Sequence, residues 1–172
     1  LFQEIDELSR IFDVADRGQQ LIAEFKQREA DLRARFGDNP DLTFLFWFSS
    51  PSVAADAYLG GKNGASGYIA DVLGGRNAIT TEAEWPTVGW EGIIAADPTV
   101  IVAASLDRNR WDLDRAENKI AFLKGDPTVS QMEAVQKGHI VTMNGAAMNP
   151  TIRTIYGAEE IAAQLEALGL LK

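Results

Sequence analysis

The sequence predicts an α/β fold in which a mostly parallel sheet lies between two layers of helices, with a long helix preceding this three-layer sandwich. Apolar runs typical of buried strands alternate with helical segments from residue 42 onward, an order that favours a parallel-type sheet. Residues 1–36 have helical periodicity almost throughout. The 172 residues, 46% of them hydrophobic, suffice for one domain with an appended element, but not for two full domains.

The first 36 residues divide into a short helix and a long one. Asp13 is a plausible N-cap with Asp16 three positions later, so the long helix is expected over about residues 14–36. Such a helix extends roughly 35 Å at 1.5 Å per residue. The segment Gly37–Pro40 then supplies ordinary stop signals.

The remaining elements alternate in type along the chain. The predicted strands are Leu42–Phe48, a short one at Asn77–Thr80, Val100–Ala104 and His139–Met143. The predicted helices are Tyr68–Leu73, about 89–96, Glu117–Leu123, Val129–Gln136 and Ile152–Leu168. This order predicts a sheet whose strand ends and connecting loops gather at one edge.

Composition narrows the range of functions. A net charge of −9 argues against a nucleic-acid partner, because phosphate neutralisation needs clustered Lys and Arg. The absence of cysteine excludes disulfides, thiolate metal sites and a Cys nucleophile. No apolar run approaches the roughly 20 residues of a membrane span. The chain begins with Leu1 and shows neither an initiator Met nor a signal peptide, so we expect a processed product or a piece of a longer protein.

Catalytic motifs are missing from the sequence. The single histidine, His139, begins an apolar strand and is expected to be a structural residue. The glycine-rich segment Gly60–Gly64 lacks the spacing of a phosphate-binding loop and is better explained as a turn that starts a helix. Because nothing assembles a nucleophile, a base and an orienting group, we expect no catalytic residue, no cofactor and no metal held by protein side chains.

Aromatic and arginine side chains cluster in the loops that follow the predicted strands, where open α/β sheets bind ligands. The predicted ligand-binding residues are Trp47, Ser50, Trp85, Arg108, Arg110, Trp111, Asn149 and Arg153. Aromatic faces with a few arginine donors suit a sizeable, partly flat, anionic ligand. Trp47 alternates with Phe46 and Phe48, so a core position is an equal alternative for it.

Several segments, in their order and spacing, resemble the C-terminal lobe of the substrate-binding proteins that serve ABC importers of ferric siderophores, haem and vitamin B12. They are the long helix with Ala15, Leu21 and Ile22, and the segments Gly74–Ala78, Trp85–Glu91, Asp97–Val102 and Ala134–Val141. Two departures stand out: Gly89-Trp90 replaces the family's usual Ser-x before a glutamate, and Thr99 stands where the family has aspartate.

The resemblance implies roles for particular residues. Residues 1–36 would be the tail of an N-terminal lobe with the linker helix, and residues 37–172 the C-terminal lobe. Glu91 would dock on a membrane permease, although an acid in the first turn of a helix is also favoured by the helix dipole alone. Trp85 would face the ligand, an iron chelate or a tetrapyrrole-type molecule.

The resemblance also implies a location, in the periplasm or on the cell surface as a lipoprotein of a Gram-positive cell. The apolar stripe at the start of the chain would be partly exposed without the other lobe, so we expect non-physiological self-association through residues 1–36.

Two other functions compete with a solute-binding component. An α/β enzyme, such as a metal chelatase or a nucleotide-using transferase, would need titratable residues that converge in one pocket. A helix-mediated interaction domain would need sustained heptads, and the apolar spacing of residues 1–36 is short and irregular.

Overall fold

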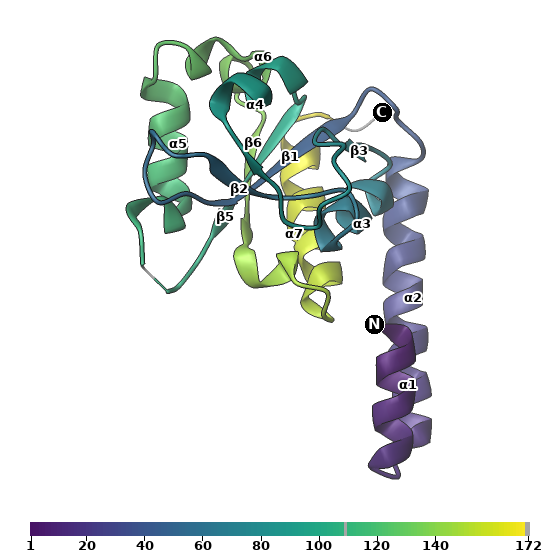
Figure 1. The fold of residues 1–172 in the computed structure, drawn as a ribbon. Helices are drawn as coiled ribbons and strands as arrows, with labels where there is room; N and C mark the ends of the chain where they lie inside the picture. Colours follow the sequence, from purple (N-terminus) through teal and green to yellow (C-terminus); the bar gives the residue numbers. More distant parts are fainter. Residues whose placement is uncertain (109, 171–172) are drawn as a thin grey trace.

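The computed structural model describes residues 1–108 and 110–170, and begins with a helical hairpin that projects from an α/β lobe (Figure 1). Helices α1 (Phe2–Ile11) and α2 (Ala15–Phe36) pack against each other along the hairpin. A Cβ at Gly18 would lie 2.4 Å from the Cβ of Ser9, so glycine permits this close approach. Among the described residues, no helix is both long and apolar enough to cross a bilayer.

The turn between the two helices differs from the prediction. Asp13 adopts a left-handed conformation, with φ of 54°, and Val14 occupies the N-cap position of α2 without a side-chain hydrogen bond. Asp13 therefore terminates α1 and does not cap α2. The long helix itself is confirmed, and its 22 residues extend about 33 Å at 1.5 Å per residue.

Helix α2 is fastened to the lobe by an apolar stripe and by ion pairs beside it. Phe25 and Leu32 are each 1% exposed. Arg28 Nε lies 3.3 Å from a carboxylate oxygen of Glu159 in α7 (Arg153–Ala167), and Arg33 Nη2 lies 2.7 Å from Asp71. These contacts give the hairpin a defined direction relative to the lobe.

The sheet has the order β4-β2-β1-β5-β6, with the two-residue β3 paired to β1. The strands are β1 (Thr43–Ser49), β2 (Ala57–Gly60), β3 (Arg76–Asn77), β4 (Thr87–Val88), β5 (Val100–Ser105) and β6 (Ile140–Asn144). Strands β1, β3, β5 and β6 run parallel, whereas β2 is antiparallel to β1 and to β4. The predicted mixed α/β fold with a mostly parallel sheet is confirmed.

Two apolar cores fill the spaces between the sheet and the helices. Phe46 points into the core shared with α2, α3 (Ala65–Val72) and α7. Trp47 points to the opposite face, which is covered by α4 (Trp90–Ala96), α5 (Ala116–Gly125) and α6 (Glu133–Gln136). Short 3-10 helices at Asp112–Asp114, Val129–Gln131 and Gly145–Met148 complete the elements among the described residues.

The antiparallel strands β2 and β4 were not predicted, and the expected strand Asn77–Thr80 is reduced to Arg76–Asn77. The predicted helix Val129–Gln136 is divided in two at Met132. His139 precedes β6, and its Nδ1 lies 3.2 Å from the carbonyl oxygen of Thr99, which agrees with a structural role.

Candidate functional site

The carboxyl ends of the parallel strands meet at one edge of the sheet. β1 ends at Ser49, β5 at Ser105 and β6 at Asn144, and Ser105 pairs directly with Asn144 in the parallel register. A break in the register between Trp47 and Ser49 bends the end of β1. The loops that leave these strands therefore share one side of the lobe, as the order of elements predicts.

A continuous row of side chains, which we call the aromatic wall, consists of Phe48, Tyr58, Trp85, Arg108 and Trp111. Trp85 packs edge-on against Phe48 with 5.0 Å between ring centres. The Arg108 guanidinium lies 5.4 Å from the Phe48 ring centre and 5.1 Å from that of Trp111. Tyr58 stacks on Trp111 at 5.8 Å. Two strands, β1 and β2, and two loops, those before β4 and after β5, thus contribute to one surface.

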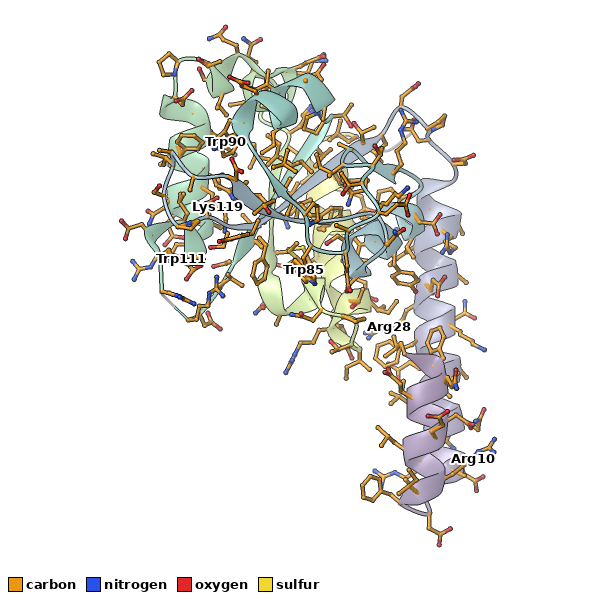
Figure 2. All side chains as sticks on the ribbon, in the orientation of Figure 1. Arg10, Arg28, Trp85, Trp90, Trp111 and Lys119 are labelled. Carbon is orange, nitrogen blue, oxygen red and sulfur yellow. The ribbon has the colours of Figure 1, made fainter. Side chains whose placement is uncertain are left out.

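The wall is accessible to a ligand. Trp85 is 39% exposed and Tyr58 37% exposed, and Figure 2 shows Trp85 and Trp111 on the side of the lobe away from Trp90. Isolated exposed aromatics are ordinary, but two pairs of packed rings joined through the Arg108 guanidinium form a preorganised, largely apolar surface. Such a surface can stack against a flat molecule, and the exposed Arg110 guanidinium beside Trp111 adds a positive charge next to it.

A buried carboxylate lies behind the wall and organises it. Asp114 is fully buried, and its carboxylate accepts hydrogen bonds from Ser49 Oγ, from Arg108 Nε and Nη2, and from the backbone N–H groups of Arg110 and Trp111. Burial alone would raise the pKa of Asp114, but these donors outweigh it and lower the pKa to about 2. Asp114 is therefore ionised and holds the loop that carries the two arginines.

A buried lysine ties the strand ends together beneath the same loop. Lys119 Nζ donates to the carbonyl oxygens of Phe48, at 2.9 Å, and of Ala104 at the ends of β1 and β5. Its side chain has no exposed surface, and burial lowers its pKa to about 8 although the charge of Asp114 opposes this. Lys119 thus stabilises the base of the wall without facing solvent.

Two of the predicted ligand contacts are corrected by their burial. Trp47 is 0% exposed within the core, and its indole N–H donates to Ser50 Oγ at 3.0 Å and to the carbonyl oxygen of Ser49. Ser50 is also 0% exposed. The bend after β1 turns both side chains inward, so neither presents a surface to a ligand and we exclude them from the binding set.

Asn149 and Arg153 lie at a different part of the same edge. Asn149 follows the 3-10 helix after β6, and its carbonyl oxygen accepts a hydrogen bond from Thr154 Oγ1. Arg153 is exposed at the start of α7 and lines a cavity of about 220 Å³ with Tyr156 and Glu160. Among the described residues, no hydrogen bond, ion pair or cation–π contact joins Asn149 or Arg153 to the aromatic wall.

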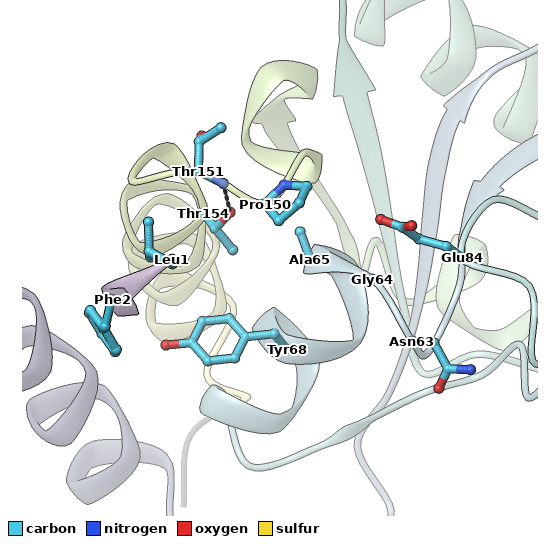
Figure 3. Close-up of a pocket in the computed structure, with 10 residues that line it drawn as sticks. All are labelled: Leu1, Phe2, Asn63, Gly64, Ala65, Tyr68, Glu84, Pro150, Thr151 and Thr154. Atoms are coloured by element: carbon cyan, nitrogen blue, oxygen red, sulfur yellow. Dashed lines mark hydrogen bonds between the residues drawn. The ribbon is translucent and has the colours of Figure 1, made fainter. Parts of the chain in front are cut away.

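A larger cavity, of about 410 Å³, lies between the start of α1, the start of α3 and the segment before α7 (Figure 3). Its lining includes Phe2, Tyr68, Glu84 and Thr154, of which Glu84 directly precedes Trp85. The Tyr68 hydroxyl donates to Glu29 of α2 at 2.7 Å. The cavity therefore lies between the long helix and the segment that leads into Trp85.

Glu91 is exposed in the first turn of α4, and Gly89 occupies the N-cap position of this helix without a side-chain hydrogen bond. Glycine has no side chain that could accept a hydrogen bond from the first turn, so this helix lacks the cap that a serine at position 89 could supply. Figure 1 places α4 at the end of the lobe away from the hairpin of α1 and α2. The acid is accessible to a partner at that end.

Sequence reasoning missed Phe48, Tyr58, Asp114 and Lys119. Tyr58 could not be found from alternation, because Ala57, Tyr58 and Leu59 are all largely apolar and their buried, exposed, buried pattern is visible only in the structure. Nothing in the sequence indicated that Lys119 is buried, since a lysine in an amphipathic helix is normally solvated. Its burial depends on the strand ends that it reaches.

The buried polar groups are not arranged for catalysis. Ser49, Asp114 and Lys119 are residue types that can act as nucleophile, acid and base, but all three are 0% exposed, so a substrate has no access to them. In the part of the chain described by the structure, no group of three or more His, Asp or Glu side chains is placed to hold a metal ion.

An α/β lobe with a ligand-sized aromatic edge and a long helix at its side defines a class of solute receptors. Comparison with known families agrees, because the periplasmic binding protein family model matches residues 1–147. The chain belongs to the periplasmic binding protein family.

Individual relatives are distant. The chain is 24% identical over 169 residues to a vitamin B12-binding protein of Vibrio parahaemolyticus, covering 95% of this chain and 55% of the relative. Two solved structures from Vibrio cholerae share the fold. The periplasmic haem-binding protein has a TM-score of 0.77 at 20% identity, covering 96% of this chain and 62% of that one. The periplasmic vitamin B12-binding protein has a TM-score of 0.71 at 21% identity, covering 98% and 61%.

The chain spans about half the length of the curated relatives it matches, 55% of the Vibrio parahaemolyticus protein and 54% of a Vibrio cholerae one.

Proposed function

We propose that this chain is the C-terminal lobe, with its linker helix, of a solute-binding component that delivers a metal chelate to an ABC importer. Residues 1–36 would belong to the linker and the edge of a preceding lobe, and residues 37–172 to the binding lobe. The aromatic wall carries this proposal, because a contiguous aromatic surface with cationic side chains suits a flat, partly anionic ligand. Relatives named for vitamin B12 and haem support the ligand class.

Ligand binding can be tested by tryptophan fluorescence with haem, cobalamin and a ferric hydroxamate as probes, using the chain in its full-length context. We expect saturable quenching by one of these probes. Trp85→Ala should lower the affinity for that probe about tenfold, equivalent to ~1.4 kcal/mol of binding free energy. Trp90→Phe is the matched control, since Trp90 packs on Trp47 and Phe122 away from the wall. Absence of saturable quenching by all three probes would contradict the proposal.

Glu91 is the proposed contact with the permease. An exposed carboxylate on the face of a lobe can orient docking on arginines of a membrane partner without affecting the ligand. Glu91→Ala should lower ligand uptake by cells while ligand affinity stays unchanged. Glu133→Ala is the matched control, because Glu133 is also an exposed acid in the first turn of a short helix. Equal uptake by both variants would remove the docking role.

The proposal sets the protein in the periplasm, or on the surface of a Gram-positive cell as a lipoprotein, in keeping with the extracytoplasmic setting that the family name gives. Neither the enzyme nor the helix-mediated interaction domain gains support from the relatives, which are named as binding proteins. The burial of Ser49, Asp114 and Lys119 also disfavours an enzyme.

A further inference from the structure

The two arginines beside Trp111 have different surroundings. Arg108 forms a two-point ion pair with Asp114, with Nε at 3.2 Å from one carboxylate oxygen and Nη2 at 3.1 Å from the other. The Arg110 side chain is exposed, and its guanidinium lies 4.8 Å from the Trp111 ring centre. Among the described residues, no hydrogen bond or ion pair engages the Arg110 guanidinium.

This difference affects what each arginine can offer a ligand. A guanidinium carries five N–H donors, and a carboxylate on its fork occupies the geometry that would otherwise bind an anion at two points. The charge of Arg108 is also balanced by that of Asp114. Arg110 keeps its donors and its charge for a group outside the protein.

Asp114 fixes the positions of both arginines. Its carboxylate binds the Arg108 side chain and accepts the backbone N–H of Arg110 at 2.8 Å and that of Trp111 at 3.1 Å. Ser49 Oγ joins the carboxylate to the end of β1. One buried acid therefore holds Arg108 in the wall and sets the backbone from which Arg110 projects.

We infer that Asp114 is the positioning residue of the aromatic wall and that Arg110, not Arg108, binds the anionic group of the ligand. The inference rests on the proposed ligand-binding function of this wall. A carboxylate-bearing ligand would place its anionic group on the Arg110 guanidinium and an adjacent flat part on the wall beside Trp111. Arg108 would contribute packing and would not contact the anion.

Nuclear magnetic resonance of the ligand-free chain tests the assignment of the arginines with inorganic sulfate as the probe. We expect the Nε–H resonance of Arg110 to shift progressively with sulfate and that of Arg108 to stay in place. Equal shifts at both arginines, or a shift at Arg108 alone, would overturn the inference. This measurement is independent of any cargo, so a failure of the proposed function is seen separately in the fluorescence experiment.

Amide hydrogen exchange tests the positioning role of Asp114. Asp114→Asn should speed exchange at the amides of Arg110 and Trp111 at least tenfold, while the amide of Val102 in the middle of β5 exchanges as before. Unchanged exchange at Arg110 and Trp111 would refute the positioning role. Faster exchange throughout the chain, with Val102 included, would also refute it, because Asp114 would then support the whole fold rather than this loop.

Conservative substitutions distinguish a ligand contact from a structural residue when haem is the probe. Arg110→Gln should weaken haem binding about tenfold or more, and Arg110→Lys should recover part of that loss, because the charge is retained although the two-point fork is lost. Arg108→Lys should not restore the affinity lost in Arg108→Gln, because a lysine cannot reproduce the two-point pair with Asp114. The reverse pattern, rescue at Arg108 and none at Arg110, would contradict the inference.

Discussion

Replacing Lys119 by methionine should remove a pH dependence of stability that the wild-type chain shows in mildly basic solution. Lys119 is buried with a pKa of about 8, against 10.5 for an ordinary lysine. Between these values the unfolded chain binds the proton and the folded chain releases it, so stability rises with pH. The cost of burying the cation is fully present below pH 8 and is relieved as the pH approaches 10.5.

The size of the effect follows from the two pKa values. Linkage between a pKa of about 8 in the folded chain and 10.5 in the unfolded chain gives a gain of roughly 2–3 kcal/mol in unfolding free energy from pH 7 to pH 10. Lys119→Met also leaves the carbonyl oxygens of Phe48 and Ala104 without their donor. That loss, about 1–3 kcal/mol for each group, changes the level of stability but not its slope with pH.

Urea unfolding of the wild type and of Lys119→Met across pH 7 to 10, followed by circular dichroism, measures the slope. Other lysines and tyrosines titrate in both proteins, so the difference between the two curves isolates Lys119. The wild type should gain about 2–3 kcal/mol relative to the variant over this range. Parallel curves would refute the reasoning and would mean that Lys119 is hydrated or fully compensated when folded.

Three further predictions concern other parts of the molecule. Phe12 is 71% exposed at the tip of the hairpin, and Phe12→Ser should reduce self-association of the chain in sedimentation velocity; identical profiles would argue against the hairpin as the contact. Gly74→Ala should destabilise the chain by more than ~2 kcal/mol in thermal unfolding, because φ is +72° and the new Cβ would meet the Gly37 carbonyl oxygen. Gly138→Ala, at φ +71° with open space around it, should cost only about 1 kcal/mol, and equal costs would contradict the steric reason. The Asp114 carboxylate should contribute about 2 kcal/mol of stability above pH 4 that is lost as the pH falls toward 2, and acid unfolding of Asp114→Asn should lack this component.

Periodicity and stop signals were sufficient to predict much of the fold. The apolar run Leu42–Phe48 became β1, and the glycines after Leu73 ended α3 with Gly74 in the left-handed conformation. Strand β4 could not be predicted, because two residues carry no periodicity. Its existence depends on pairing with β2, which is a tertiary contact.

Some residues of the candidate site could be predicted from the sequence and others could not. The physical reason differs between residues. Trp85 and Trp111 were found because aromatic residues in polar loops are conspicuous. Trp47 and Phe48 are adjacent and similar, and only the face of β1 on which each side chain lies decides that Trp47 is core and Phe48 is wall. That decision is made by packing against helices distant in sequence, which a strand pattern alone does not contain.

Strand β2 runs antiparallel to β1 and sets the position of Tyr58 in the wall. The stability of the lobe depends instead on the packing of the parallel strands. Tyr58 of the wall lies on β2. Phe48 lies on the parallel strand β1, and Trp111 lies in the loop that follows the parallel strand β5. A slip of two residues in the β2 pairing would carry the tyrosine position about 7 Å along the strand while keeping it on the same face. The spacing between Tyr58 and the rest of the wall could therefore change through substitutions in one short hairpin while the parallel strands keep their packing.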